Sequence, residues 1–235
     1  MAFALCVSGA TGVFGQVSFE LGLKAGVGLT KLSGDDTKAS SIIIEDPEFS
    51  LNLQGDLGDS KLGFVVGGYG AVHVTHQFGV RLEALYLRKG GKGDVSVEAD
   101  IPGFGVINFD AEVTATLDYI ELPLLAVVSF PAGPSGSFEV FAGPALAFKT
   151  KAEIEVEVTT LGQTEKEDIG DETKGTDFGG VIGAGFVFEL ARVDLFADVR
   201  YTYGFTKILD IAEDFDIKNS AFGLMVGVAL PLPMN

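Results

Sequence analysis

Two histidines are the residues best suited to catalysis or metal binding, and they stand close together at His73 and His76. An imidazole can act as a general base, as a metal ligand or as the partner of a nucleophilic serine. On an extended strand, positions three apart point to opposite faces, so we expect that these two rings cannot chelate one metal ion. We interpret both as polar residues beside a short turn.

Other catalytic or ligand-binding patterns are incomplete in this chain. The long polar segments contain no histidine, which excludes a serine–histidine pair there. The spacing Gly183 to Gly185 lacks the third glycine of a dinucleotide loop, and the acids at Asp35, Asp36 and Asp214 do not match an EF-hand. We therefore predict no enzyme, no cofactor and no metal centre. A carboxylate-only mechanism and weak divalent-cation binding by acidic loops stay open as alternatives.

A second group of charged residues occupies alternate positions within apolar segments. Because alternate residues of a strand share one face, acids and bases are gathered on the side opposite the apolar one. A charge held away from water is costly unless it is paired, so we predict a network of ion pairs and hydrogen bonds. The alternative is a polar ligand pocket or a proton path along the same face. The predicted network consists of Glu20, Lys24, Arg81, Glu83, Glu121, Glu139, Lys149, Glu189, Asp194, Asp198 and Arg200.

Eight segments with this alternation must position the charged residues. In the first, every odd position from Phe19 to Leu29 is apolar, whereas the even positions hold glycine, Glu20 or Lys24. Each segment is long enough for a tilted strand to cross a bilayer. The segments are residues 19–29, 62–74, 78–86, 119–130, 138–149, 178–190, 193–203 and 222–230.

The connections between these segments alternate between short and long. Three are short turns, near residues 76–77, 131–136 and 191–192, and four are long, near residues 30–60, 90–115, 150–176 and 206–219. This alternation is typical of an all-β, eight-stranded antiparallel up-and-down transmembrane barrel with short periplasmic turns and four long extracellular loops. Alternation continues into residues 107–113 and 153–158, so we expect these strands to extend past the membrane as hairpins.

Side-chain volume decides which face is the outer one. The interior of an eight-stranded barrel is just wide enough for side chains, and the glycine-rich charged face fits that space. The face rich in Phe, Leu, Ile and Val then contacts lipid. The alternative is a soluble ligand-binding β-barrel with its apolar side inside, but its outer wall would be nearly neutral and rich in glycine.

Composition is consistent with a membrane wall that carries acidic loops. The chain has 235 residues, 47% of them hydrophobic, with 16 Lys and Arg against 33 Asp and Glu and a formal charge of −17. This imbalance excludes a basic nucleic-acid-binding protein. Most of the acidic excess falls in the four long connections. We hypothesise that this acidic crown binds divalent cations or other extracellular ligands, or suits a saline exterior.

The first 15 residues differ from the rest of the chain. They are apolar, uncharged and end in small residues, so we predict an atypical signal peptide at residues 1–15 that lacks a basic start. Residues 16–235 are predicted to form a single barrel domain. The one cysteine, Cys6, lies in the predicted signal peptide, which excludes a disulfide scaffold.

Several motifs resemble the small outer-membrane β-barrels labelled porin-family or PorT-like, which are similar to OmpX and OmpA. They are FELGLKAGVGLTKLSGDD (19–36), GVRLEALYLRKG (79–90), DYIELPLL (118–125), EVFAGPALAF (139–148) and DVRYTYGFTKI (198–208). The resemblance implies an eight-stranded barrel in a Gram-negative outer membrane and no established activity. It also implies outer-membrane lipid and the barrel-assembly machinery as partners.

We expect a monomeric, non-enzymatic outer-membrane protein. Its lumen would be plugged by side chains, its loops would be acidic, and its role would be structural or in surface interaction. The alternative within the same architecture is a narrow channel for small solutes or ions.

Overall fold

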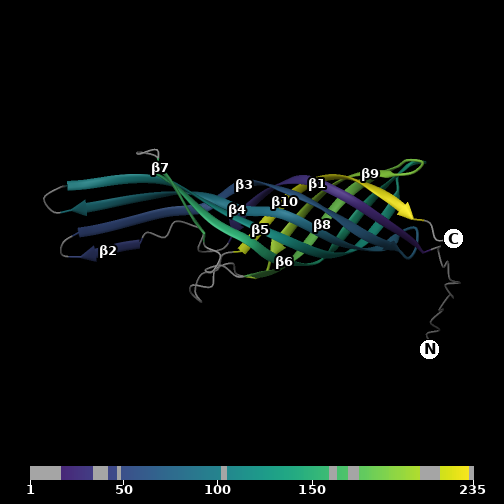
Figure 1. The fold of residues 1–235 in the computed structure, drawn as a ribbon, viewed down its shortest axis with the longest axis horizontal. Helices are drawn as coiled ribbons and strands as arrows, with labels where there is room; N and C mark the ends of the chain where they lie inside the picture. Colours follow the sequence, from purple (N-terminus) through teal and green to yellow (C-terminus); the bar gives the residue numbers. More distant parts are fainter. Residues whose placement is uncertain are drawn as a thin grey trace, which may run out of the picture.

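The part of the chain that the structure describes forms ten antiparallel strands, and eight of them close into a ring (Figure 1). The computed structural model describes residues 17–33, 42–46, 49–101, 105–158, 163–168, 175–206 and 218–232. The strands are β1 (Ser18–Ser33), β2 (Ile42–Asp46), β3 (Phe49–His73), β4 (Phe78–Ile101), β5 (Gly105–Pro131), β6 (Gly136–Val158), β7 (Gln163–Asp168), β8 (Thr176–Glu189), β9 (Asp194–Gly204) and β10 (Lys218–Leu232).

The ring closes because β1 pairs with both β3 and β10. Phe19 lies opposite Val72 on one side and opposite Leu232 on the other. From β3 the ring continues through β4, β5, β6, β8, β9 and β10, with every neighbouring pair antiparallel. The predicted all-β, eight-stranded up-and-down barrel is confirmed. Among the described residues, no helix is long and apolar enough to cross a membrane.

The two ends of the ring differ in the length of their connections. Residues 74–77, 132–135 and 190–193 make short turns at one end, which we call the turn end. At the other end, the protruding end, β3 to β6 reach 23 to 27 residues and project well beyond the ring (Figure 1). The predicted hairpin extensions are therefore present. The sequence analysis missed the short strands β2 and β7, which pair with β3 and β6 beyond the ring.

The outer wall of the ring is apolar, as the alternation predicts. Leu23, Leu62 and Phe78 are 67%, 66% and 55% exposed, and the apolar partners on the other strands point the same way. Their charged neighbours point inward: Lys24, Arg81 and Glu83 are at most 3% exposed. A band of large apolar side chains on the outside, with charges inside, is the arrangement that a lipid bilayer requires.

The polarity of the two faces reverses where the strands leave the ring. The pairing of β4 with β5 keeps one register throughout, so the alternation itself continues without a slip. On β4 the outward positions change from Val80 and Leu82 in the ring to Asp94 and Ser96 beyond it, all of them exposed. Because water replaces lipid around the projecting strands, the outer face changes from apolar to charged.

Some predicted features lie outside the described residues. The predicted signal peptide at residues 1–15 is one of them, and so are Asp35, Asp36 and Asp214.

Candidate functional site

Glycine and large rings fit together inside the ring. A Cβ added at Gly22 would lie 2.2 Å from the Tyr69 ring, and one at Gly227 would lie 2.3 Å from the Phe196 ring. These inward glycines therefore make the space that the two aromatic rings occupy. The lumen also holds buried Phe141 and Leu125, so it is more apolar than the sequence analysis predicted.

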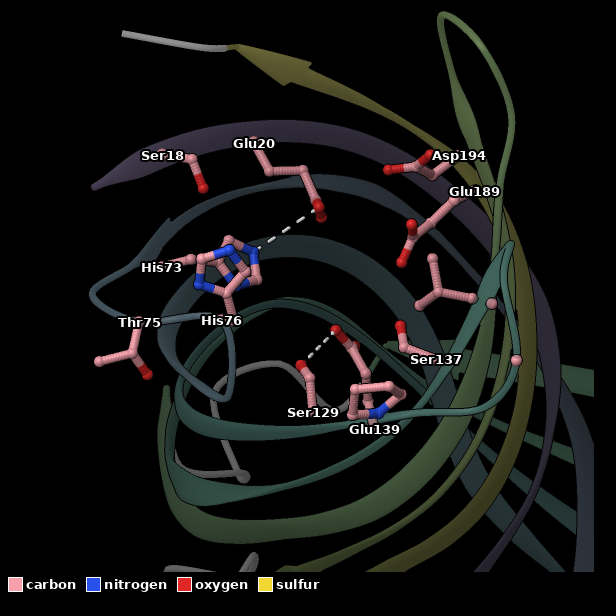
Figure 2. Close-up of a pocket in the computed structure, with 14 residues that line it drawn as sticks. Ser18, Glu20, His73, Thr75, His76, Ser129, Ser137, Glu139, Glu189 and Asp194 are labelled. Carbon is pink, nitrogen blue, oxygen red and sulfur yellow. Dashed lines mark hydrogen bonds and ion pairs between the residues drawn. The ribbon is translucent and has the colours of Figure 1, made fainter. Parts of the chain in front are cut away.

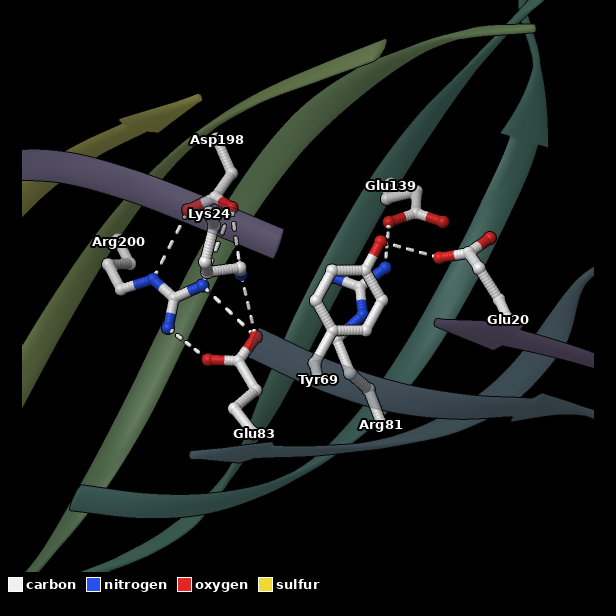
Figure 3. A network of polar contacts seen from close by, with 8 residues as sticks. All are labelled: Glu20, Lys24, Tyr69, Arg81, Glu83, Glu139, Asp198 and Arg200. Carbon is white, nitrogen blue, oxygen red and sulfur yellow. Dashed lines mark hydrogen bonds and ion pairs between the residues drawn. The ribbon is translucent and has the colours of Figure 1, made fainter. Parts of the chain in front are cut away.

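A four-residue cluster crosses the middle of the lumen (Figure 3). Glu83 of β4 accepts a hydrogen bond from Lys24 Nζ of β1 at 2.8 Å and from Arg200 Nη1 of β9 at 2.6 Å. Asp198 accepts from Lys24 Nζ at 3.3 Å and from Arg200 Nε at 3.2 Å. Two cations and two carboxylates thus join three strands that are not neighbours in the ring.

A second cluster lies nearer the turn end. Arg81 Nη2 donates to Glu139 Oε2 at 2.6 Å, and the Tyr69 hydroxyl donates to Glu20 Oε1 at 2.6 Å. The guanidinium carbon of Arg81 lies 4.7 Å from the centroid of the Tyr69 ring, which links the two pairs by a cation–π contact (Figure 3). Ser129 adds a hydrogen bond from its hydroxyl to Glu139 at 3.2 Å.

A third cluster lies nearer the protruding end. Lys89 Nζ donates to Glu121 Oε2 at 2.7 Å and lies 5.4 Å from the centroid of the Tyr119 ring. Asn219 Nδ2 lies 3.4 Å from both the Tyr119 hydroxyl and Asp177 Oδ2. The three clusters follow one another along the lumen, since Arg81, Glu83 and Lys89 succeed each other on β4.

The structure brings together eight of the eleven residues predicted for the network. They are Glu20, Lys24, Arg81, Glu83, Glu121, Glu139, Asp198 and Arg200. Of the others, Asp194 is buried and Glu189 exposed at the turn end, and Lys149 is half-buried beside a bulge in the pairing of β5 with β6.

The sequence analysis missed six participants of the three clusters: Lys89, Tyr69, Tyr119, Ser129, Asp177 and Asn219. Lys89 and Tyr69 share the inward parity of Arg81 and Gly67 on their strands, so the alternation could have identified them. Asn219 lies at the start of β10, before the apolar alternation begins, and the sequence carries no comparable signal for it.

A polar pocket opens at the turn end (Figure 2). Its volume is about 380 Å³, and we call it the vestibule. The vestibule is lined by Ser18, Glu20, His73, Thr75, His76, Ser129, Pro131, Gly133, Gly136, Ser137, Glu139, Val187, Glu189 and Asp194. It ends where Glu20 and Glu139 meet the second cluster.

Both histidines line the vestibule, which corrects the expectation that they face opposite sides. β3 ends at His73, and His76 belongs to the following turn, so the alternation of a strand does not extend to it. His73 Nε2 lies 3.7 Å from Glu20 Oε2. Within the part of the chain that the structure describes, no group of three or more His, Cys, Asp or Glu could hold a metal ion.

Comparisons with known proteins agree with this architecture. Residues 14–210 match the family model described as "Outer membrane protein beta-barrel domain". No curated protein is similar enough in sequence to match the chain.

Solved structures are similar in fold only. Neisserial surface protein A is 16% identical, with a TM-score of 0.44, covering 91% of this chain and 97% of its own. Ail of Yersinia pestis, solved with the heparin analogue sucrose octasulfate, is 14% identical, with a TM-score of 0.39 and coverages of 90% and 99%. The outer membrane protease OmpT of Escherichia coli is 8% identical, with a TM-score of 0.33 and coverages of 93% and 96%.

Proposed function

The chain belongs to the outer membrane protein β-barrel domain family and is located in the bacterial outer membrane, and from this premise we propose a non-enzymatic surface role. Side chains close the lumen of the barrel, and the projecting strands present an acidic surface to the exterior. The ring is a membrane anchor, and the protruding end is the part that meets other molecules. The outer-membrane location excludes the soluble ligand-binding barrel.

The central cluster is the observation that carries a closed lumen. Lys24, Glu83 and Arg200 come from three strands, and the side chains of Lys24 and Glu83 are fully buried. An open aqueous channel would hydrate these groups, whereas here each is paired with another side chain. Opening a path would require separating buried charges, which costs several kcal/mol for each one left unpaired.

A non-enzymatic role is supported by the contacts inside the vestibule. The hydroxyl of Ser129, which lines the vestibule, donates a hydrogen bond to Glu139 and not to an imidazole. His73 is oriented toward Glu20, so it is not poised to activate a serine in this arrangement. The same vestibule gives the second candidate function some support, because an aqueous entry on one side is what a narrow channel also needs.

Recording conductance across planar bilayers separates the two functions. The closed barrel predicts no stable open conductance for the reconstituted wild-type protein. A steady, reproducible open level at neutral pH would overturn the closed lumen in favour of the channel. Folding of the protein used for reconstitution is verified by the resistance of the ring to unfolding in detergent.

We propose outer-membrane lipid, the barrel-assembly machinery and divalent cations as partners. The exposed apolar belt supports contact with outer-membrane lipid, and assembly by the barrel-assembly machinery would follow from family membership. Divalent cations at the acidic loops are a further proposal, and depletion of cations by a chelator tests it through the thermal stability of the folded protein.

A further inference from the structure

Beyond the ring, the face that continues from the lumen is apolar. In the ring, this face carries the three charged clusters, but from Leu117 and Ala152 outward it carries aliphatic side chains. Ala115 packs against the core cluster that contains Leu117, and Val113 and Val156 follow farther out, both half-buried. We call this aliphatic surface of β5 and β6 the inner floor.

Acidic side chains border the inner floor along β7. Ile154 lies opposite Glu167 and Val156 lies opposite Glu165, and residues directly opposite each other project from the same face of a sheet. Two successive rows across the sheet share one order of residue types: glycine on β4, aliphatic residues on β5 and β6, and glutamate on β7. The rows are Gly91, Ala115, Ile154, Glu167 and Gly93, Val113, Val156, Glu165. Glu165 and Glu167 are two positions apart on β7, so their backbones are about 6.6 Å apart along the strand.

A cavity lies over this border. Its volume is about 460 Å³, and it is lined by Ile154, Val156, Glu165, Lys166 and Glu167. That volume falls within the roughly 300–1,000 Å³ of small-ligand pockets. The neighbouring ring strand β8 does not reach this level, because the pairing of β6 with β8 stops at Phe148 and Thr176. The described strands thus leave the inner floor open.

Charge distinguishes the two edges of the cavity. The exposed Lys166 Nζ is engaged with Glu155 Oε2 of the outer face at 2.9 Å. Glu165 and Glu167 are exposed, and neither forms an ion pair with a cation of the described residues. The cavity therefore offers an aliphatic base and two carboxylates at its edge, with its nearest ammonium already bound elsewhere.

The geometry points to a binding site for a polypeptide segment that carries aliphatic and basic side chains on one face. The aliphatic side chains would cover Ile154 and Val156, and a lysine or arginine would pair with Glu165 or Glu167. An acidic segment would meet repulsion at β7, and a wholly polar one would leave the inner floor exposed to water. This site rests on the proposed surface role and names the chemistry of its partner.

Binding of short synthetic peptides to the full chain in neutral phosphatidylcholine vesicles tests the site. In the probe peptide every second residue is serine, and the residues between the serines are leucine and lysine in turn. An extended probe therefore carries leucine and lysine on one face and serine on the other. Two comparison peptides replace all lysines by glutamate or all leucines by serine. We expect saturable binding of the probe, and binding weaker by at least about tenfold for both comparison peptides.

Matched variants locate the binding. Glu165→Gln with Glu167→Gln, and separately Ile154→Thr with Val156→Thr, should each weaken binding of the probe by roughly tenfold. The control is Asp94→Asn with Glu157→Gln, which removes the same charge from the outer face and should change binding by less than about twofold. Equal weakening by the control pair would overturn the site, because it would indicate general attraction to an acidic protein. Absence of saturable binding would overturn it as well.

The result of the peptide-binding experiment does not depend on whether the lumen is closed. A protein that fails to bind the probe but shows no conductance loses the binding site and keeps its closed barrel. If the protein conducts, and its binding of the probe requires Glu165 and Glu167, the binding site is supported and the closed lumen is overturned.

Discussion

Glu83 holds two cations at once in the lumen. Its side chain is fully buried, and its two oxygens meet Lys24 and Arg200 at 2.8 and 2.6 Å. By contrast, Lys92 and Glu112 form a pair on the projecting strands, where both side chains are nearly half exposed. The hydrogen bond to Glu112 raises the pKa of the Lys92 ammonium above its ordinary value, so this ammonium stays charged at neutral pH.

Replacing Glu83→Ala should destabilise the folded protein by about 3–5 kcal/mol, because it leaves Lys24 and Arg200 buried without their shared carboxylate. Urea unfolding of protein in lipid vesicles measures the free energy of unfolding. The matched control is Glu112→Ala, which breaks the exposed pair and should cost about 0–1 kcal/mol. Equal losses for the two variants would contradict a buried, cohesive cluster.

Gly22 makes room for the Tyr69 ring, so Gly22→Ala should displace the ring and weaken the hydrogen bond from its hydroxyl to Glu20. We expect a lower free energy of unfolding, by about 1–3 kcal/mol for overpacking. Gly70→Ala is the control, since a Cβ there would lie 3.6 Å from Leu21, an ordinary contact. If Gly22→Ala is as stable as Gly70→Ala, the ring does not occupy the space described.

At the scale of the strand, β4 runs from lipid into water, and its side chains alternate between the two faces without interruption. Leu82 is 55% exposed on the lipid-facing wall, and Ser96 is exposed on the same face beyond the ring. The position of each side chain is set by the alternation, whereas its polarity is set by the medium that it meets.

A lysine substituted at these two positions should therefore have unequal effects. Leu82→Lys is expected to cost about 2–4 kcal/mol, the cost of a basic residue near the middle of a bilayer. Ser96→Lys should change the free energy of unfolding by less than about 0.5 kcal/mol, because the site is exposed and outside the packed ring. Folding titrations in vesicles give both values, and a small loss for Leu82→Lys would place it outside the lipid.

The alternation explains why so much of the ring could be predicted from the sequence. Each apolar and charged position of β1, β4 and β9 has a face dictated by parity alone, and the closed ring follows from strand number and turn length. The partners within the lumen could not be predicted, because they depend on the register of strands far apart in sequence. Lys24 meets Glu83 and Asp198 only once the ring has closed.

Two further features escaped prediction for local reasons. β7 is a short charged strand without an apolar alternation, so only its pairing with β6 reveals it. The opposite orientation of His73 and His76 was inferred from strand geometry, but His76 lies in the short turn predicted near residues 76–77, where that geometry does not apply. Turn boundaries and edge strands carry weak patterns, and both matter at the two ends of this barrel.

At the scale of the whole molecule, the ring and the projecting sheet have different surfaces and different roles. The ring is an apolar wall around paired charges, and the sheet beyond it has an acidic outer face and an aliphatic inner floor. The sheet is paired strand to strand, so its tip adds little to the closure of the ring.

Shortening the β4–β5 hairpin tests this division. Replacing residues 94–110 by a short turn removes pairing partners from the tip of β3 but none from the ring. The shortened protein should still migrate differently on SDS gels when boiled and unboiled, as a closed barrel does. Loss of this difference would show that the ring depends on the projecting sheet.

Thiol labelling along β4 tests the central claim, a closed lumen inside a lipid-facing wall, most directly. In a Cys6→Ser background, cysteine is placed one at a time at Leu82, Leu85 and Ser96, which are lipid-facing, buried in the lumen and exposed beyond the ring. A charged, membrane-impermeant thiol reagent applied to folded protein in vesicles should modify Ser96→Cys readily and leave Leu82→Cys and Leu85→Cys unmodified. Modification of Leu85→Cys at the rate of Ser96→Cys would contradict the account, because it would mean that water fills the lumen.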